Sequence, residues 1–175
     1  VAVGLPHSIE TARWSRVLAE GVYRPMAAWV SAQTAPEELI QVSDIGYVGY
    51  FSGRRILDSS ALVSPEVAEY YAGHRDDPAR EARCVLLREP KLVILPAAGT
   101  IVKRFVAGGL GDRYRPAARF RAPGMGEGVG SAGATANPRR FDADFAVFER
   151  FGGLTEIWAD HPRRRARRVT GRERA

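Results

Sequence analysis

VSDIGYVGYFSGRRILD, residues 42–58, is the stretch from which the fold is predicted. An apolar run ends at Asp44, a glycine-containing helical turn follows over 45–51, and a second apolar run over 55–58 ends at Asp58. Strands that alternate with helices favour a largely parallel sheet with the helices packed on it. The stretch therefore predicts two strands of an α/β domain joined by a short helix.

The rest of the chain continues this alternation. Apolar periodicity predicts helices over 8–31, 65–71 and 76–88, and Pro25 is expected to kink the first of them near Tyr23. Further strands are predicted over 38–43, 91–95, 114–121 and 142–150. We expect a three-layer α/β sandwich with a small, mostly parallel central sheet flanked by helices. The strands around Val42 and Leu92 should be central and buried, because both are apolar on both faces.

The 175 residues are enough for one domain and too few for two. Residues 1–33 are predicted as a leading helical segment, 34–150 as the α/β domain with a glycine-rich loop at 122–138, and 151–175 as a basic, disordered tail. No stretch reaches the roughly 18–20 apolar residues that span a bilayer, and no signal peptide is visible. The single cysteine, Cys84, excludes an internal disulfide.

Much of the net charge of +6 comes from the arginines of the tail, which are densest over Arg163–Arg168. Such a run is attracted to anionic lipid headgroups, and nucleic acid would attract it equally well in a cytoplasmic protein. Without the tail the domain is nearly neutral. We therefore expect contact with an anionic membrane surface and no specific nucleic-acid partner.

The central stretch, followed by Ala61-Leu62-Val63-Ser64-Pro65, resembles the soluble C-terminal domains of GT-C-type membrane glycosyltransferases. These enzymes are relatives of protein mannosyltransferases and mycobacterial arabinofuranosyltransferases. The resemblance covers roughly residues 25 to 150. Its flanking parts are the helix Met26–Val30, the turn Thr34–Pro36 and the strands Lys91–Leu95 and Phe145–Phe148. The sequence departs from the pattern at Ser59–Leu62, where such domains more often have an apolar residue and a glycine before the leucine.

The resemblance implies an accessory extracytoplasmic domain of a transferase that uses a polyprenyl-phosphate-linked sugar, where it would shape the acceptor site or bind glycan. The expected location is the cell membrane, with this domain on the extracytoplasmic (periplasmic) side. The implied partners are the transmembrane region of the parent protein and a glycan or lipid-linked sugar acceptor. In that family the catalytic acidic residue lies in an extracytoplasmic loop near the start of the membrane region, so the parent is expected to be the enzyme and this segment to carry no catalytic residue.

Candidate ligand or cleft residues lie in and around the central stretch. They are Asp44, Gly46, Tyr47, Tyr50, Arg54 and Asp58. Gly46 and Gly49, three residues apart, leave one helix face without side chains, which favours close packing on a strand over admission of a phosphate. Asp44 is expected to cap the helix and so to occupy the donors that a phosphate would need.

Two carboxylate patterns could carry chemistry. Asp44 and Asp58 end successive strands and would share one edge of the sheet if the strands were parallel neighbours, although aspartates at strand ends commonly cap backbone N–H groups. Asp142 and Asp144 match the D-x-D pattern of other sugar transferases, but two aspartates at this spacing also share the solvent face of a strand. The three histidines are isolated, so neither a metal site nor a cofactor is predicted.

Two other classes of function stay open. The first is a free-standing interaction or regulatory α/β module. The second is a small Rossmann-like nucleotide-binding enzyme, which rests only on Gly46, Gly49 and the alternation of strands and helices.

Overall fold

The computed structural model describes residues 12–97, 100–122 and 144–151. Most of the glycine-rich loop, together with Asp142 and the basic tail, lies outside the described residues. Residues 12–18 are helical. The elements that follow are η1 (Ala19–Tyr23), α2 (Arg24–Gln33), β1 (Leu39–Val42), α3 (Ile45–Ser52), β2 (Arg55–Asp58), α4 (Pro65–Gly73), α5 (Arg80–Leu87), β3 (Leu92–Pro96), α6 (Thr100–Ala107), η2 (Leu110–Asp112), β4 (Tyr114–Arg121) and β5 (Asp144–Arg150).

The five strands form one sheet in the order β2-β1-β3-β5-β4. β1 pairs in parallel with both β2 and β3. β5 is antiparallel to both of its neighbours, β3 and β4, so it alone runs against the other four strands. The prediction of a small, mostly parallel sheet is confirmed.

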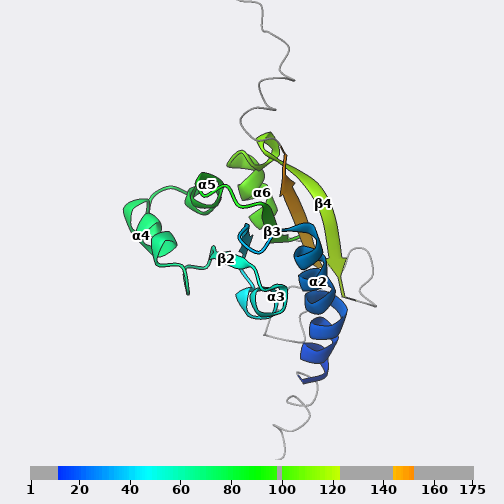
Figure 1. The fold of residues 1–175 in the computed structure, drawn as a ribbon. Coiled ribbons are helices and arrows are strands. Elements are labelled where there is room, and N and C mark those ends of the chain that lie inside the picture. Colours follow the sequence, from blue (N-terminus) through cyan, green and yellow to red (C-terminus); the bar gives the residue numbers. More distant parts are fainter. Residues whose placement is uncertain (1–11, 98–99, 123–143, 152–175) are drawn as a thin grey trace, which may run out of the picture.

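Helices cover both faces of this sheet and make the three layers that the sequence predicts (Figure 1). On one face, side chains of residues 18–30 and of α3 pack against β1, β3 and β5. On the other face, α4, α5 and α6 enclose a second apolar core. Ile40, Val42 and the whole of β3 are buried, as predicted for central strands covered on both sides.

A π-helix directly precedes Pro25. The backbone N–H of Arg24 donates to the carbonyl of Ala19, five residues back, in place of the usual four. Pro25 has no N–H, and its ring would crowd the preceding turn, so the wider π-turn accommodates it. The kink predicted near Tyr23 therefore takes the form of a π-turn. This turn leaves Tyr23 buried beside the sheet, where its hydroxyl reaches Asp44.

Two helical segments differ from the sequence prediction. The helix predicted over 76–88 begins only at Arg80, because Asp77 accepts a hydrogen bond from the N–H of Ala79 (2.9 Å) in a turn before the helix. The helix α6 was not predicted. It is one of the shorter helices, and the glycines at 108 and 109 that follow it favour a loop by composition.

Close packing of α5 on α6 depends on Gly108. A Cβ atom at this position would lie 2.6 Å from the Cβ of Ala82, which is buried in α5. Real Cβ atoms do not approach so closely, so the two helices would have to separate.

We predict that Gly108→Ala destabilises the domain by about 1–3 kcal/mol, the usual cost of overpacking a core. Urea unfolding monitored by circular dichroism measures the change. Gly73→Ala is the matched control, because no atom lies within 4 Å of a Cβ at the end of α4. Equal stability of the two variants would contradict the packing explanation.

Candidate functional site

Asp44 and Asp58 lie at the same edge of the sheet. β1 and β2 are parallel neighbours with Val42 opposite Asp58, and Asp44 follows β1 by two residues. This is the carboxyl edge of the parallel strands, where α/β folds commonly bind ligands. The two carboxylates nevertheless have different partners and do not form a pair that shares a proton.

The Asp58 carboxylate is buried and hydrogen-bonds to backbone N–H groups. It accepts hydrogen bonds from the N–H groups of Ser60 (2.8 Å), Leu62 (2.5 Å) and Val63 (3.0 Å). The N–H of Asp58 in turn donates to the Ser64 hydroxyl at 3.0 Å. A carboxylate held by three backbone donors is structural, so the geometry favours the capping alternative over acid–base catalysis.

A buried polar chain lies beside this loop. Gln41, fully buried in β1, donates through Nε2 to the Ser59 hydroxyl at 2.9 Å, and its Oε1 has no partner among the described residues. Ser59 also hydrogen-bonds to Glu81 of α5, whose pKa is raised chiefly by burial. Tyr71 donates to the carbonyl of Ser59 at 2.8 Å, and burial raises its pKa. These contacts join β1, α4 and α5 to the loop after β2.

Asp44 does not cap α3, which corrects the expectation from the sequence. It occupies the cap position, but its side chain makes no hydrogen bond to the helix backbone. Its carboxylate accepts a hydrogen bond from the hydroxyl of Tyr23 instead. The negative charge still lies beside the first turn of α3, so this helix end remains unfavourable for a phosphate.

Tyr23 begins a row of aromatic rings that leads to the surface. Tyr47 stacks on Tyr23 with ring centroids 5.3 Å apart and is also stacked with Phe51 at 5.9 Å. Tyr50 meets Phe51 edge to face at 5.1 Å, and the Arg24 guanidinium lies 4.8 Å from the Phe51 ring centre.

We call Tyr47, Tyr50 and Phe51 the aromatic surface. Their exposed fractions are 40%, 82% and 41%. Tyr47 and Phe51 use their ring faces partly for one another, whereas Tyr50 presents most of its ring to solvent. Large aromatic side chains exposed together mark a contact surface more often than isolated ones do.

The two glycines of α3 have different surroundings. A Cβ on Gly49 would lie 3.1 Å from Cγ1 of Ile56, so this position lets α3 pack closely on β2, as the glycine spacing predicts. A Cβ on Gly46 would meet no atom within 4 Å. Gly46 is exposed next to Tyr47 and adds open space to the same surface.

Arg54 is a structural clamp. Its guanidinium donates to the carbonyls of Ser31 (2.6 Å), Thr34 (2.9 Å) and Ser52 (3.2 Å), and its Nε donates to the Thr34 hydroxyl (3.0 Å). It thereby caps the carboxyl end of α2 and ties it to the end of α3. These contacts engage all three guanidinium nitrogens, which leaves Arg54 a poor candidate for ligand binding.

The second aspartate of the D-x-D pattern is held by an arginine. Arg119 donates to both carboxylate oxygens of Asp144, at 2.8 and 2.6 Å, and Arg121 lies 3.7 Å away. The hydrogen bond from Arg119 lowers the pKa of Asp144. Asp142 lies outside the described residues. Within the part of the chain that the structure describes, no group of three or more His, Cys, Asp or Glu side chains could hold a metal.

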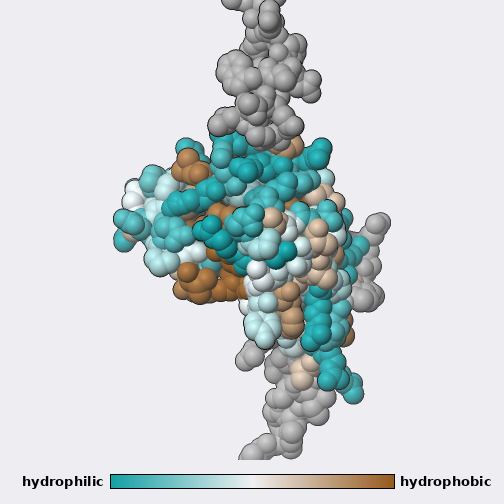
Figure 2. All heavy atoms as spheres, in the orientation of Figure 1, coloured by the Kyte–Doolittle hydropathy of each residue, from teal (hydrophilic) through white to brown (hydrophobic). Residues whose placement is uncertain are grey.

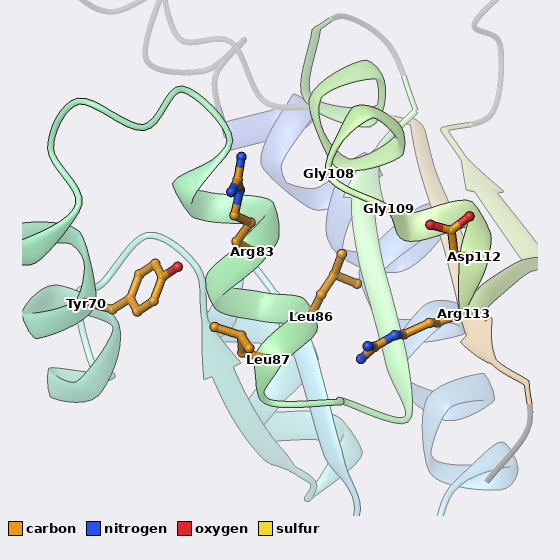
Figure 3. A pocket seen from close by; sticks show the side chains of 8 residues that line it. All are labelled: Tyr70, Arg83, Leu86, Leu87, Gly108, Gly109, Asp112 and Arg113. Atoms are coloured by element: carbon orange, nitrogen blue, oxygen red, sulfur yellow. The ribbon is translucent and has the colours of Figure 1, made fainter. Parts of the chain in front are cut away.

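A pocket of about 260 Å³ opens away from these residues, between α5 and the chain after α6 (Figure 3). None of the sequence-predicted site residues lines it. Its two arginines are already paired, Arg83 with Asp77 at 3.2 Å and Arg113 with Glu89 at 3.3 Å. Both basic side chains of the pocket are therefore engaged, and the carboxylate of Asp112 is its remaining charged group.

The fold and the surface together define a three-layer α/β domain with exposed aromatic residues on α3. The chain belongs to the family described as a domain of unknown function (DUF8728), whose model matches residues 11–148. No curated protein and no solved structure was found to match it. Among the described residues, no helix is long and apolar enough to cross a membrane.

Sequence reasoning missed the contribution of residues outside the central stretch. Tyr23 and Arg24 complete the aromatic row although they precede it by about twenty residues. Gln41 had a visible signal, because it is the one polar residue in the apolar strand Leu39–Val42. Tyr23 gives no such signal as the partner of Asp44, because no local sequence pattern links two residues that are 21 positions apart.

We predict that Arg54→Lys lowers the free energy of unfolding by about 1–3 kcal/mol, because a lysine ammonium cannot reproduce the forked set of hydrogen bonds. Chemical denaturation measures this change. The neighbouring exposed Arg55 provides the control, and Arg55→Lys should change stability by less than about 0.5 kcal/mol. Similar losses in both variants would show that the clamp contributes little.

Proposed function

We propose that this chain is a non-catalytic accessory domain of a polyprenyl-phosphate-dependent membrane glycosyltransferase and that it binds glycan through the aromatic surface. The parent protein would place it on the extracytoplasmic side of the cell membrane, attached to the transmembrane region. The exposed tyrosine at position 50, beside Tyr47 and Phe51, is the observation that carries the proposal. The sequence resemblance supplies the class of enzyme.

The aromatic surface suits a sugar in two respects. The C–H groups of a sugar ring make an apolar face that packs on an aromatic ring, and Tyr50 leaves most of its ring free for this contact. The Tyr47 and Tyr50 hydroxyls supply donors and acceptors for sugar hydroxyls. Tyr47 stacks on the buried Tyr23 and on Phe51, and these contacts order the rings before a ligand binds.

The carboxylates at the site support binding over catalysis. Asp58 is engaged by backbone donors, and Asp44 accepts from Tyr23. Within the described part of the chain, Asp58 binds backbone N–H groups, and the side-chain partner of Asp44 is the tyrosine hydroxyl of Tyr23 in place of a second carboxylate or a histidine. A Rossmann-like nucleotide enzyme is less well supported, because the Asp44 carboxylate lies at the end of α3 where a phosphate would bind.

We predict that Tyr50→Ala weakens binding of methyl α-mannoside or methyl α-arabinofuranoside about tenfold, equivalent to about 1.4 kcal/mol, by removing the open stacking ring. Chemical-shift titration by NMR measures the affinity. Phe151→Ala is the control, because Phe151 is an exposed aromatic residue at the end of β5, outside the aromatic surface. Unchanged affinity in Tyr50→Ala would contradict the proposed site. So would the absence of sugar binding by the unsubstituted 175-residue chain.

We also predict that the isolated chain transfers no sugar from nucleotide sugars or polyprenyl-phosphate sugars. A radiolabelled-donor assay tests this directly. Transfer that is lost in both Asp142→Ala and Asp144→Ala would overturn the proposal in favour of the D-x-D pattern.

A further inference from the structure

Two neighbouring aliphatic side chains project from the loop between β2 and α4. Leu62 and Val63 are 77% and 61% exposed, and we call this pair the aliphatic tip. In Figure 1 the loop extends below the sheet at the lower left, and Figure 2 shows hydrophobic surface in the same place. Soluble domains tolerate single exposed aliphatic residues, but a protruding pair requires an explanation.

The loop that carries the tip is held in a fixed conformation. The Asp58 carboxylate binds the N–H groups of both Leu62 and Val63. The Tyr71 hydroxyl binds the carbonyl of Ser59 at the start of the loop. Ala61 has a φ of 61°, a left-handed conformation that is unfavourable for a residue with a Cβ atom. The chain therefore accepts local strain and a buried carboxylate at the point where it exposes two apolar side chains.

A second apolar feature extends from the same edge of the sheet. The helix of residues 12–18 begins beyond the carboxyl edge, on the side toward which the loop projects (Figure 1). It exposes Trp14 and Val17, each 39% accessible, and carries exposed Arg13 and Arg16. Tryptophan with flanking arginine is typical of side chains that lie at a membrane–water interface.

We propose that the carboxyl edge faces a lipid bilayer and that Leu62 and Val63 insert into its apolar layer. A convex pair of aliphatic side chains suits a deformable apolar phase better than a protein surface, which would need a matching cavity. Trp14 and the two arginines would lie at headgroup depth. The inference rests on the proposed function for the bilayer itself, since attachment to a membrane region would keep the domain beside one.

The charges near the tip define what kind of lipid surface it prefers. Glu66 and Glu69 are exposed on α4, immediately after the loop. They oppose close approach to anionic headgroups, while the arginines of residues 12–18 favour it. Insertion of the tip should therefore depend on apolar contact and occur on neutral phosphatidylcholine. Two aliphatic side chains partition weakly, so insertion should be evident when the domain is already held at the bilayer.

The test places an environment-sensitive fluorophore at the tip of the full chain, in Val63→Cys with Cys84→Ala. An added amino-terminal hexahistidine tag tethers the protein to phosphatidylcholine vesicles that contain a nickel-chelating lipid. Nitroxide on the lipid acyl chains should quench the fluorophore by at least half. Leu87→Cys is the matched control, because Leu87 is 66% exposed at the end of α5, near the opposite edge of the sheet. Quenching at 87 should be absent, and equal quenching at both positions, or none at 63, would overturn the proposal.

A second measurement uses no label. Leu62→Ser with Val63→Ser changes only exposed side chains, so the fold should survive, as circular dichroism will verify. Flotation of the tagged chain with the nickel-containing phosphatidylcholine vesicles, at an imidazole concentration that releases about half of it, should fall about threefold in this variant. An unchanged bound fraction would count against the tip. Tyr50→Ala should leave insertion intact, whereas loss of the tip should leave sugar affinity intact. Failure of lipid insertion is thus distinguishable from failure of glycan binding.

Discussion

The hydrogen bonds of the buried Asp58 carboxylate are the interaction on which the arrangement of layers depends. Before Asp58 the chain has built one face of the sheet with α2 and α3, and after it the chain builds the other face with α4 and α5. The change of face takes place in the loop whose N–H groups Asp58 binds. Burying a carboxylate is costly unless its lone pairs are satisfied, and here the backbone satisfies them. The same interaction fixes the turn and the direction of the tip.

Residues that hold the backbone and residues that face solvent lie close together in the sequence. Arg54 donates its hydrogen bonds to backbone carbonyl groups, and Asp58 accepts hydrogen bonds from backbone N–H groups. Tyr47 and Tyr50, a few residues earlier, face solvent. A rigid frame next to exposed rings is the arrangement that binding sites require, because a ligand then meets side chains that are already ordered. Charged residues in a motif therefore do not by themselves mark the contact surface.

The strands could be predicted from the sequence because their signals are local. An unbroken apolar run such as Leu92–Leu95 is buried on both faces whatever its neighbours are, and the predicted span 114–121 coincides with β4. The candidate site was less predictable, since partners distant in the chain decide what each side chain does. Asp44 follows the pattern of a helix cap, yet the Tyr23 hydroxyl is its partner. Two of the carbonyls that Arg54 binds lie at the end of α2, 23 and 20 residues earlier in the chain. Local patterns give residue types and positions but not these long-range pairings.

The π-turn of η1 determines in which direction the side chains of the preceding helix, residues 12–18, point. A π-turn is equivalent to one residue inserted into a regular helix. If the same five residues, Ala19–Tyr23, wound as a regular α-helix, residues 12–18 would be rotated by about 100° about the helix axis. The sheet and α2 could stay in place, yet Trp14 and Val17 would point in a new direction. The number of residues per turn in η1, and not the composition of the helix, thus sets the direction of the exposed Trp14 and Val17 relative to the rest of the domain.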